Sequence, residues 1–342
     1  MAFFGKTGFF IGVGGLIPTL LLASGLATGS VFDLPSGAGD EVYPTRPITL
    51  VTGFSAGDGP DMVVRHLADV LSQELGQPVI VSNRPGSAGN VAAAAVAIAD
   101  PDGYTVNLAV RPSAPNRAML DSIPIGYSRN LEPVGMIAHL PYVLVMGKHV
   151  AAETLHDAVA LAREKPGVFT CASAGPGSTA HVLCETLGEK AGLSWEHIAY
   201  DGATPAVTEV IGGEADFAIV TVAAALRFIK WDLVRPLAVF AVDRVAAIPS
   251  VPAIEEYGYG DVRAQGWYAI AAPAGTPAYA VARLNRAINA MHSKERLREK
   301  LVKLGYVLPA AERNSPEEAG IFLAEDAERW TRVVEQRGME GL

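Results

Sequence analysis

The stretch Ile48-Thr49-Leu50-Val51-Thr52-Gly53-Phe54-Ser55-Ala56-Gly57-Asp58-Gly59-Pro60-Asp61 decides the fold class. Residues 48–54 are mostly β-branched or apolar, so they predict a strand. Residues 60–75 carry apolar side chains at helical spacing and are followed by Gly76, which predicts an amphipathic helix that ends there. A strand, a glycine-bearing turn and a helix together form the repeating unit of α/β folds.

The same alternation continues along the chain. We predict further strands over 79–81, 104–110, 142–146, 169–172, 216–220, 235–242 and 267–272, and further helices over 90–99, 154–165, 179–191, 204–211, 278–292 and 294–304. A last helix is expected from Pro316, because Ser315 and Glu318 have the spacing of a capping box. The order of these elements predicts an α/β protein.

Composition limits the class of protein and of partner. The chain has 342 residues, 50% of them hydrophobic and 18% charged, which is enough apolar material for two domains. The net charge is −9, and no run rich in Lys and Arg occurs. Nucleic acid and anionic membrane are therefore disfavoured as partners, and a dissolved small molecule is favoured.

The first residues have the pattern of an export signal. Lys6 is followed by an uncharged, largely apolar stretch from 7 to 32 with small residues around Ala27. We therefore predict a signal peptide over 1–27, cleaved after Ala27, and a disordered lead-in over 28–43, so that the mature protein is exported. An uncleaved membrane anchor is the alternative, since the apolar run is almost long enough to span a bilayer.

The chain has two cysteines, Cys171 and Cys184. In an oxidising compartment they could pair, because one is predicted at a strand end and the other on the following helix. A bridge needs Cα atoms about 4.4–6.8 Å apart, which the sequence does not establish. We expect two buried thiols and keep the disulfide as the alternative.

Three loops share one physical design. Each of 54–61, 84–90 and 172–181 follows a predicted strand, turns on Gly and small polar residues, and leads into a predicted helix. Such junctions present unpaired backbone N–H groups and the positive end of a helix dipole, which favour a carboxylate or phosphate. One such loop is often a plain turn, but two in the first half and one in the second predict an anion-binding cleft between two lobes.

The motifs that surround these loops occur in a recognisable order. In chain order they are Tyr43-Pro44-Thr45-Arg46-Pro47-Ile48, Phe54-x-x-Gly57-x-Gly59-x-Asp61, Asn83-Arg84-Pro85-Gly86-x-x-Gly89-Asn90, Pro101-Asp102-Gly103-Tyr104, Ala172-Ser173-x-Gly175-x-Gly177-Ser178-x-x-His181, Tyr200-x-Gly202-x-x-Pro205-Ala206, Ile211-Gly212-Gly213-x-x-Asp216 and Ala272-Pro273-Ala274-Gly275-Thr276-Pro277. This order resembles the tripartite tricarboxylate transporter receptors, also called Bug-type periplasmic solute-binding proteins. The resemblance extends from about Tyr43 to Trp330.

The resemblance implies a type II periplasmic binding protein, with two α/β lobes joined by crossing strands and a ligand cleft between them. By this analogy the first lobe comprises 44–141 plus 267–342, and the second comprises 142–266. Such a receptor is a monomer that captures a small carboxylate and delivers it to the permease subunits of a membrane transporter. It performs no catalysis and needs no cofactor or metal.

The resemblance also implies which residues contact the ligand. On the first lobe they are Phe54, Ser55, Ala56, Gly57, Gly59 and Asp61, and on the second they are Ser173, Gly175, Gly177, Ser178 and His181, with Tyr200, Gly202, Pro205 and Asp216 along the far wall. The loops are expected to hold the carboxylate largely through backbone N–H groups, small hydroxyls and water.

Two acids depart from the family pattern. Asp58 stands where a glycine is usual, and Asp201 stands where a lysine is common. A desolvated acid would repel a bound carboxylate, so these side chains either face solvent or meet a cation. Arg111 is a candidate for that cation, or for a group that binds a carboxylate bidentately. Asp58 is alternatively a plain N-cap. We hypothesise that the ligand carries an amino or other donor group besides its carboxylate.

Other classes of protein are less well supported. No His-Glu-x-x-His motif occurs. One Gly-x-Ser-x-Gly match is present, Gly53-Phe54-Ser55-Ala56-Gly57, and it lies in the first of the three glycine loops. His181 with Cys184 would suit a nucleophile or metal site, but no third orienting group is evident. A sensor subunit that presents its ligand to a membrane kinase would have the same soluble domain. Trp267, at a strand that returns between the lobes, is expected to report their closure.

Overall fold

The computed structural model describes residues 42–57, 59–86, 89–111 and 130–336. The predicted signal segment 1–27, nearly all of the lead-in 28–43, and Asp58 lie outside these ranges. Within them, no helix has both the length and the apolar character that crossing a bilayer requires.

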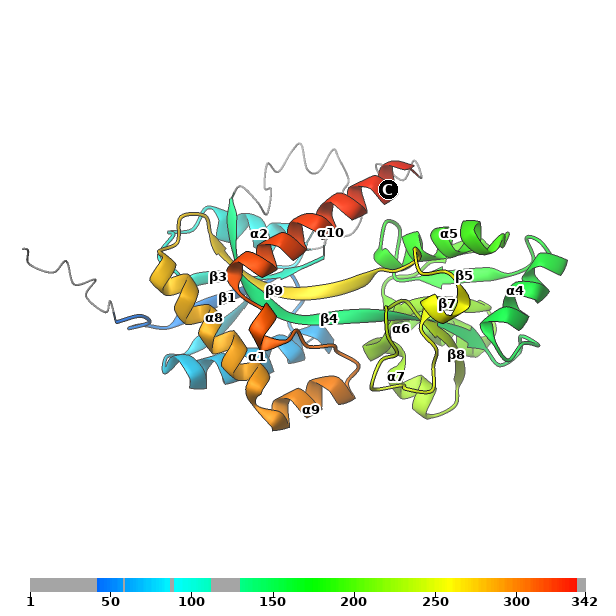
Figure 1. Cartoon of the computed structure of the whole chain (residues 1–342), viewed down its shortest axis with the longest axis horizontal. Coiled ribbons are helices and arrows are strands. Elements are labelled where there is room, and N and C mark those ends of the chain that lie inside the picture. Colours follow the sequence, from blue (N-terminus) through cyan, green and yellow to red (C-terminus); the bar gives the residue numbers. More distant parts are fainter. Residues whose placement is uncertain (1–41, 58, 87–88, 112–129, 337–342) are drawn as a thin grey trace, which may run out of the picture. The chain divides into compact units, whose positions relative to one another are not determined.

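The described part of the chain alternates strands and helices, as Figure 1 shows. The strands are β1 (Ile48–Thr52), β2 (Val79–Asn83), β3 (Thr105–Val110), β4 (Leu131–Gly147), β5 (Thr170–Ser173), β6 (Glu196–Ala199), β7 (Phe217–Thr221), β8 (Val234–Val239) and β9 (Gln265–Pro273). The helices are α1 (Gly59–Leu75), α2 (Asn90–Ala97), α4 (Leu155–Glu164), α5 (Thr179–Ala191), α6 (Ala203–Gly212), α7 (Val222–Lys230), α8 (Ala278–Ser293), α9 (Glu295–Lys303) and α10 (Pro316–Gln336), with short 3-10 turns at Ile254–Tyr257 and Ala311–Arg313.

Strand β4 belongs to two halves of one sheet. Up to Pro141 it pairs antiparallel with β9, which pairs in turn with β3, and β3, β1 and β2 lie parallel. From Tyr142 onward it pairs with β7, and from Val143 with β8 on its other edge, while β5 lies parallel to both β7 and β6. The 17-residue strand β4 therefore crosses from one half to the other (Figure 1).

Each half of the sheet is covered by helices on both faces, because successive strand side chains point to opposite faces. In the first half, Leu50 of β1 packs into a core that includes α1 and α8, and Val51 packs into one that includes α2 and α10. In the second half, Leu144 of β4 joins a core with α4 and α5, and Val143 joins one with α6 and α7. These four cores are separate on either side of the crossing, while a small fifth cluster joins Val182 of α5 to Trp330 of α10.

Most predicted elements are present within a few residues of their predicted bounds. The capping box of α10 is confirmed, since Glu318 N donates to Ser315 Oγ (3.1 Å) and Ser315 N donates to the Glu318 carboxylate (3.0 Å). The first part of β4 was not predicted, because prolines and a glycine interrupt its alternation. Strand β6 and helix α7 were also missed: β6 is short and partly exposed, and α7 follows β7 without an intervening turn.

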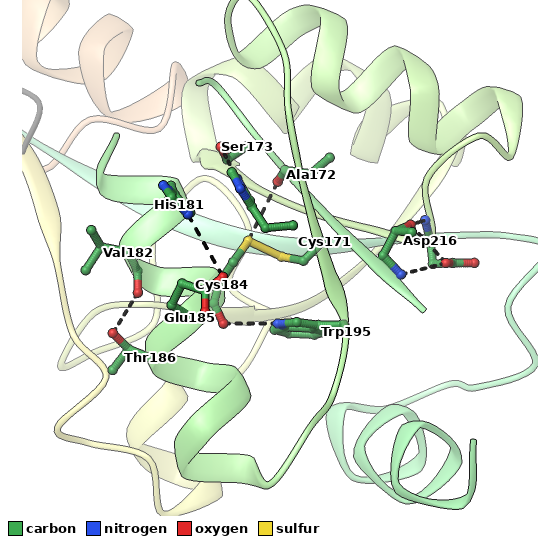
Figure 2. Close-up of a disulfide and its surroundings, with 12 residues drawn as sticks. Cys171, Ala172, Ser173, His181, Val182, Cys184, Glu185, Thr186, Trp195 and Asp216 are labelled. Atoms are coloured by element: carbon green, nitrogen blue, oxygen red, sulfur yellow. Dashed lines mark hydrogen bonds and ion pairs between the residues drawn. A yellow bond between two sulfur atoms is a disulfide. The ribbon is translucent and has the colours of Figure 1, made fainter. Parts of the chain in front are cut away.

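The expectation of two free thiols is wrong. Cys171 on β5 and Cys184 on α5 form a disulfide, with a Cα–Cα distance of 6.2 Å, as Figure 2 shows. Both residues are fully buried in the core of the second half. The return of α5 over β5 brings the two cysteines within bonding range, and that return is a tertiary feature which sequence spacing did not establish.

We predict that removing this cross-link lowers the free energy of unfolding by about 3 kcal/mol, because a closed loop of this size restricts the unfolded chain. The test is urea unfolding of the protein and of the Cys171→Ala/Cys184→Ala variant. Unfolding the unaltered protein with a reductant separates the cross-link from the packing of the sulfur atoms. Identical transitions with and without reductant would contradict the prediction.

Candidate ligand-binding site

A cavity of about 300 Å³ lies where the two halves of the sheet meet. Its described wall consists of Gly53, Phe54, Gly89, Val110, Arg111, Leu140, Tyr142, Thr179, Gly266, Trp267 and Tyr268. These residues come from the loop after β1, the start of α2, the end of β3, the crossing strands β4 and β9, and the start of α5. Its volume is at the small end of the range for ligand pockets.

Two glycines let the main chain form part of this wall. A Cβ atom on Gly53 would lie 2.4 Å from the Cα of Gly89, so the loops after β1 and β2 meet backbone to backbone. Gly89 is itself in the left-handed region, with φ +94°, immediately before α2. Any side chain at Gly53 would push these loops apart.

Asp61 holds the loop after β1 in place. Its buried carboxylate accepts hydrogen bonds from Gly57 N (2.9 Å), Asn83 Nδ2 (2.7 Å) and Arg65 Nε (2.8 Å). The hydrogen bond from the Gly57 backbone, followed by that from Asn83, lowers the pKa of Asp61 to about 2. Asn83 also donates to the Phe54 carbonyl (3.0 Å). The Asp61 carboxylate is therefore occupied by donors of the protein itself, and these hydrogen bonds stabilise the conformation of the loop.

The loop after β5 is held in the same way by its own side chains. Ser178 caps α5 by accepting from His181 N (3.2 Å), and His181 Nδ1 accepts from Gly177 N (3.0 Å). Ser173 Oγ lies 2.7 Å from His197 Nε2. The first amides of a helix have no intrahelical acceptor, so those of Thr179 and Ala180 are available beyond the helix end. Thr179 lies in the cavity wall.

The two histidines beside this loop supply no positive charge at neutral pH. The rings of His181 and His197 stack with centroids 3.7 Å apart. Burial lowers the pKa of both, and the proximity of His181 helps to bring the pKa of His197 to about 4. A Cys–His nucleophile is excluded here, because Cys184 is in the disulfide. In the described ranges, no three His, Cys, Asp or Glu side chains gather as a metal site would require.

Residues 63–339 match the sequence model of the tripartite tricarboxylate transporter family receptor. The chain belongs to this family. The receptor is also 34% identical over 300 residues to protein BugT of Bordetella pertussis, an alignment that covers 87% of this chain and 91% of BugT.

Solved structures show the same architecture. Rpa4515 of R. palustris, solved with adipate, is 27% identical with a TM-score of 0.75, and the match covers 86% of this receptor and 98% of that chain. MatC of Rhodopseudomonas palustris, solved with bound malate, is 26% identical with a TM-score of 0.72 and covers 85% and 100%. The receptor therefore has the two-lobed type II periplasmic-binding-protein fold, as predicted.

The predicted site residues fall into distinct groups in the receptor. Phe54 and Arg111 lie in the cavity wall. Ser173, Gly175 and Tyr200 meet at the carboxyl edge of the second half, where Tyr200 N donates to the Ser173 carbonyl (3.0 Å). The others at this edge are Gly177 and Ser178 in the loop after β5, His181 on α5, and Gly202 and Pro205 at the start of α6.

The predicted residues of the first loop are mostly open to solvent. Ser55, Ala56 and Gly57 are exposed, and Gly59 begins α1. Asp201 is exposed as well, and Asp58 lies outside the described residues. Of the two alternatives for Asp201, the structure thus favours the one in which its side chain faces solvent.

Asp216 does not lie with the other predicted residues. It precedes β7 and bonds to Thr170 at the start of the parallel strand β5, with Thr170 N donating to its carboxylate (2.9 Å) and His149 Nε2 3.1 Å away. The candidate loop follows the other end of β5, so Asp216 is at the opposite edge of the sheet, apart from Ser173 and His181 (Figure 2). We therefore leave Asp216 out of the site.

Sequence reasoning missed most of the residues on the crossing strands. Tyr142, Trp267 and Tyr268 form an aromatic part of the cavity wall, and Phe54 meets Tyr268 edge to face with ring centroids 5.8 Å apart. Burial raises the pKa of Tyr142 and Tyr268, so both phenols stay protonated. The available signal was that two predicted strands began at Tyr142 and Trp267, at the predicted lobe boundaries.

We predict that Gly53→Ala lowers the free energy of unfolding by about 1–3 kcal/mol, because the new methyl group overlaps the Gly89 backbone and cannot be relieved by a side-chain rotation. Urea unfolding measures this change.

Gly212→Ala is the matched control. A Cβ atom there meets nothing within 4 Å, and Gly212 is the last residue of α6. The free energy of unfolding of the Gly212→Ala variant is expected to equal that of the unaltered protein or to exceed it by up to about 1 kcal/mol. If both substitutions changed the free energy of unfolding equally, the contact between Gly53 and Gly89 would not require a glycine at position 53.

Proposed function

We propose that this receptor binds a small organic carboxylate in the cavity at the crossing of β4 and β9, and that it does so without catalysis. The observation that carries the proposal is the shared wall: the main chain of Gly53 and Gly89 comes from the first half, and Thr179 at the start of α5 comes from the second. The amino-terminal end of a helix carries a partial positive charge and free N–H groups, which favour an anion.

The acids bound by two proteins of the same fold support this class of ligand, because Rpa4515 was solved with adipate and MatC with malate. The hypothesis of an amino-substituted ligand loses part of its basis, because Asp201 is exposed. We therefore propose a carboxylate without requiring an amino group.

We further propose that lobe 1 comprises 44–141 plus 267–342 and that lobe 2 comprises 142–266. The change of partner along β4 at Pro141 and Tyr142 supports this division, since β4 and β9 would link the lobes at the cavity. Ligand binding would bring the lobes together. Trp267, which is buried in the cavity wall, is the expected fluorescent reporter of that closure.

The wider role also follows from membership of the family. We propose that the segment 1–27 directs export to the periplasm, and that the monomeric receptor hands its ligand to the permease subunits of a tripartite transporter. A sensor that presents the ligand to a membrane kinase is the competing role. Co-purification of the membrane partner separates the two, because a permease would support the transport role and a kinase would contradict it.

The test of ligand class is thermal unfolding of the receptor, purified from the periplasm, with a panel of organic acids that includes adipate and malate. An acid present at a hundred times its dissociation constant should add about 2.7 kcal/mol to the free energy of unfolding. The uncharged diamides of the same acids serve as controls and should have no effect. Stabilisation by the diamides, or by none of the acids, would overturn the proposal.

A further inference from the structure

The described wall of the cavity offers a ligand no uncompensated charge. Among the described residues in this wall, Arg111 alone is charged at neutral pH, and its side chain is only 5% exposed. Its Nε donates to Asp326 Oδ2 (3.0 Å), its Nη2 donates to Asp326 Oδ1, and its Nη1 is buried. Asp326 therefore compensates the positive charge of Arg111, and the pair adds no net charge to the wall.

The polar side-chain atoms of the aromatic residues in this wall have partners within the protein. Trp267 Nε1 donates to a carboxylate oxygen of α10 (2.9 Å). The hydroxyl of Tyr268 is hydrogen-bonded to Tyr306, and that of Tyr142 is hydrogen-bonded to Thr179. A ligand in the cavity therefore meets mainly the faces and edges of these rings, while the main-chain donors at the start of α5 stay available for its carboxylate.

The rest of this wall is apolar and largely aromatic. Phe54 meets Tyr268 edge to face, with ring centroids 5.8 Å apart, and Val110 and Leu140 add aliphatic surface. Aromatic rings in offset or edge-to-face contact are stabilised beyond the effect of the area that they bury. A flat ring placed against Phe54 and Tyr268 can make such contacts, whereas a saturated ring of similar size cannot.

A second carboxylate on the ligand would find no partner of opposite charge in the described wall. An anion that loses its hydration without gaining such a partner is strongly destabilised. An uncharged ring has no such penalty. The cavity, at about 300 Å³, has room for a ring as well as a carboxylate, because an apolar cavity of about 150 Å³ is enough to bind benzene.

We propose that the receptor binds an aromatic monocarboxylate, with its carboxylate at the start of α5 and its ring against Phe54 and Tyr268, and that it discriminates against dicarboxylates. This rests on the proposed function, which supplies the carboxylate site. Phe54 and Tyr268 then determine specificity through ring contacts, and the absence of an uncompensated cation from the described wall excludes a second negative charge.

The test is isothermal titration of the receptor with two matched pairs of acids. Para-toluate and terephthalate have similar lengths and differ in the group at the far end of the ring, which is a methyl group or a second carboxylate. Para-toluate should bind at least about ten-fold more tightly, because its far end loses no hydration of a charge. Benzoate and cyclohexanecarboxylate differ only in the ring, and benzoate should bind about five-fold more tightly, the effect of one aromatic contact.

The same titrations separate this inference from the proposed function. Terephthalate that binds as tightly as para-toluate, or cyclohexanecarboxylate that binds as tightly as benzoate, would overturn the inference. Binding of adipate or malate with no binding of either aromatic monocarboxylate would also overturn it, but would leave the proposed function standing. If none of these acids binds the unaltered receptor, the proposed function fails together with the inference.

Phe54→Leu tests the ring contact. The substitution keeps an apolar side chain and the main-chain carbonyl that accepts from Asn83, so the loop after β1 should keep its conformation. The preference for benzoate over cyclohexanecarboxylate should fall below about two-fold, because the aromatic contact is lost. Both acids should still bind. A preference that stays about five-fold in this variant would overturn the role of Phe54.

Phe169→Leu is the matched control. Phe169 also belongs to an edge-to-face pair, with the ring centroid of Phe217 at 5.9 Å, but this pair lies in the core of the second half and outside the described cavity wall. The variant should keep the preference of the unaltered receptor for benzoate. An equal loss of preference in both variants would overturn the inference, because the loss would then not depend on the cavity wall.

Discussion

Strand β4 is the element on which the rest of the site depends. Its hydrogen-bonding partner changes from β9 to β7 and β8 within a few residues of Pro141, so one continuous strand belongs to both halves of the sheet. The main hydrophobic cores of the halves are separate and each half is covered on both faces by helices, with one small cluster of Val182 and Trp330 between α5 and α10. A ligand at the crossing can therefore touch both lobes without disturbing either core.

The site combines main-chain donors with side chains that serve the loops. Asp61, Ser178 and His181 bond to backbone amides of their own loops, and so they hold those loops in shape. The disulfide between Cys171 and Cys184 ties α5 to β5 at the base of one loop. Because these side chains hold the loops and leave ligand binding to main-chain donors, the side chains around the cavity can be aromatic or aliphatic although the proposed ligand is an anion.

The sequence predicted the fold better than it predicted the site. Regular periodicity and the capping box of Ser315 and Glu318 located most helices and strands, because these signals are local. The first part of β4 was missed because Pro133, Gly135 and Pro141 interrupt its pattern, although pairing with β9 keeps it extended. Phe54 and Arg111, which were among the predicted site residues, lie in the cavity wall, whereas Thr179 enters that wall through tertiary packing, which has no local signal. Asp216 was included on the resemblance alone; it precedes β7, which runs parallel to β5, so it lies at the end of the sheet opposite the loop after β5.

A crystal structure of the receptor with the acid that stabilises it most would test the central claim directly. The account predicts that the acid lies in the cavity at the crossing strands, with its carboxylate within hydrogen-bond distance of the first amides of α5 and close to the Gly53 main chain. A second cavity of about 210 Å³ lies between α10 and the segments around Ala241 and Ala264, and Arg263 and Arg329 line it. An acid bound there, with the first cavity empty, would contradict the account.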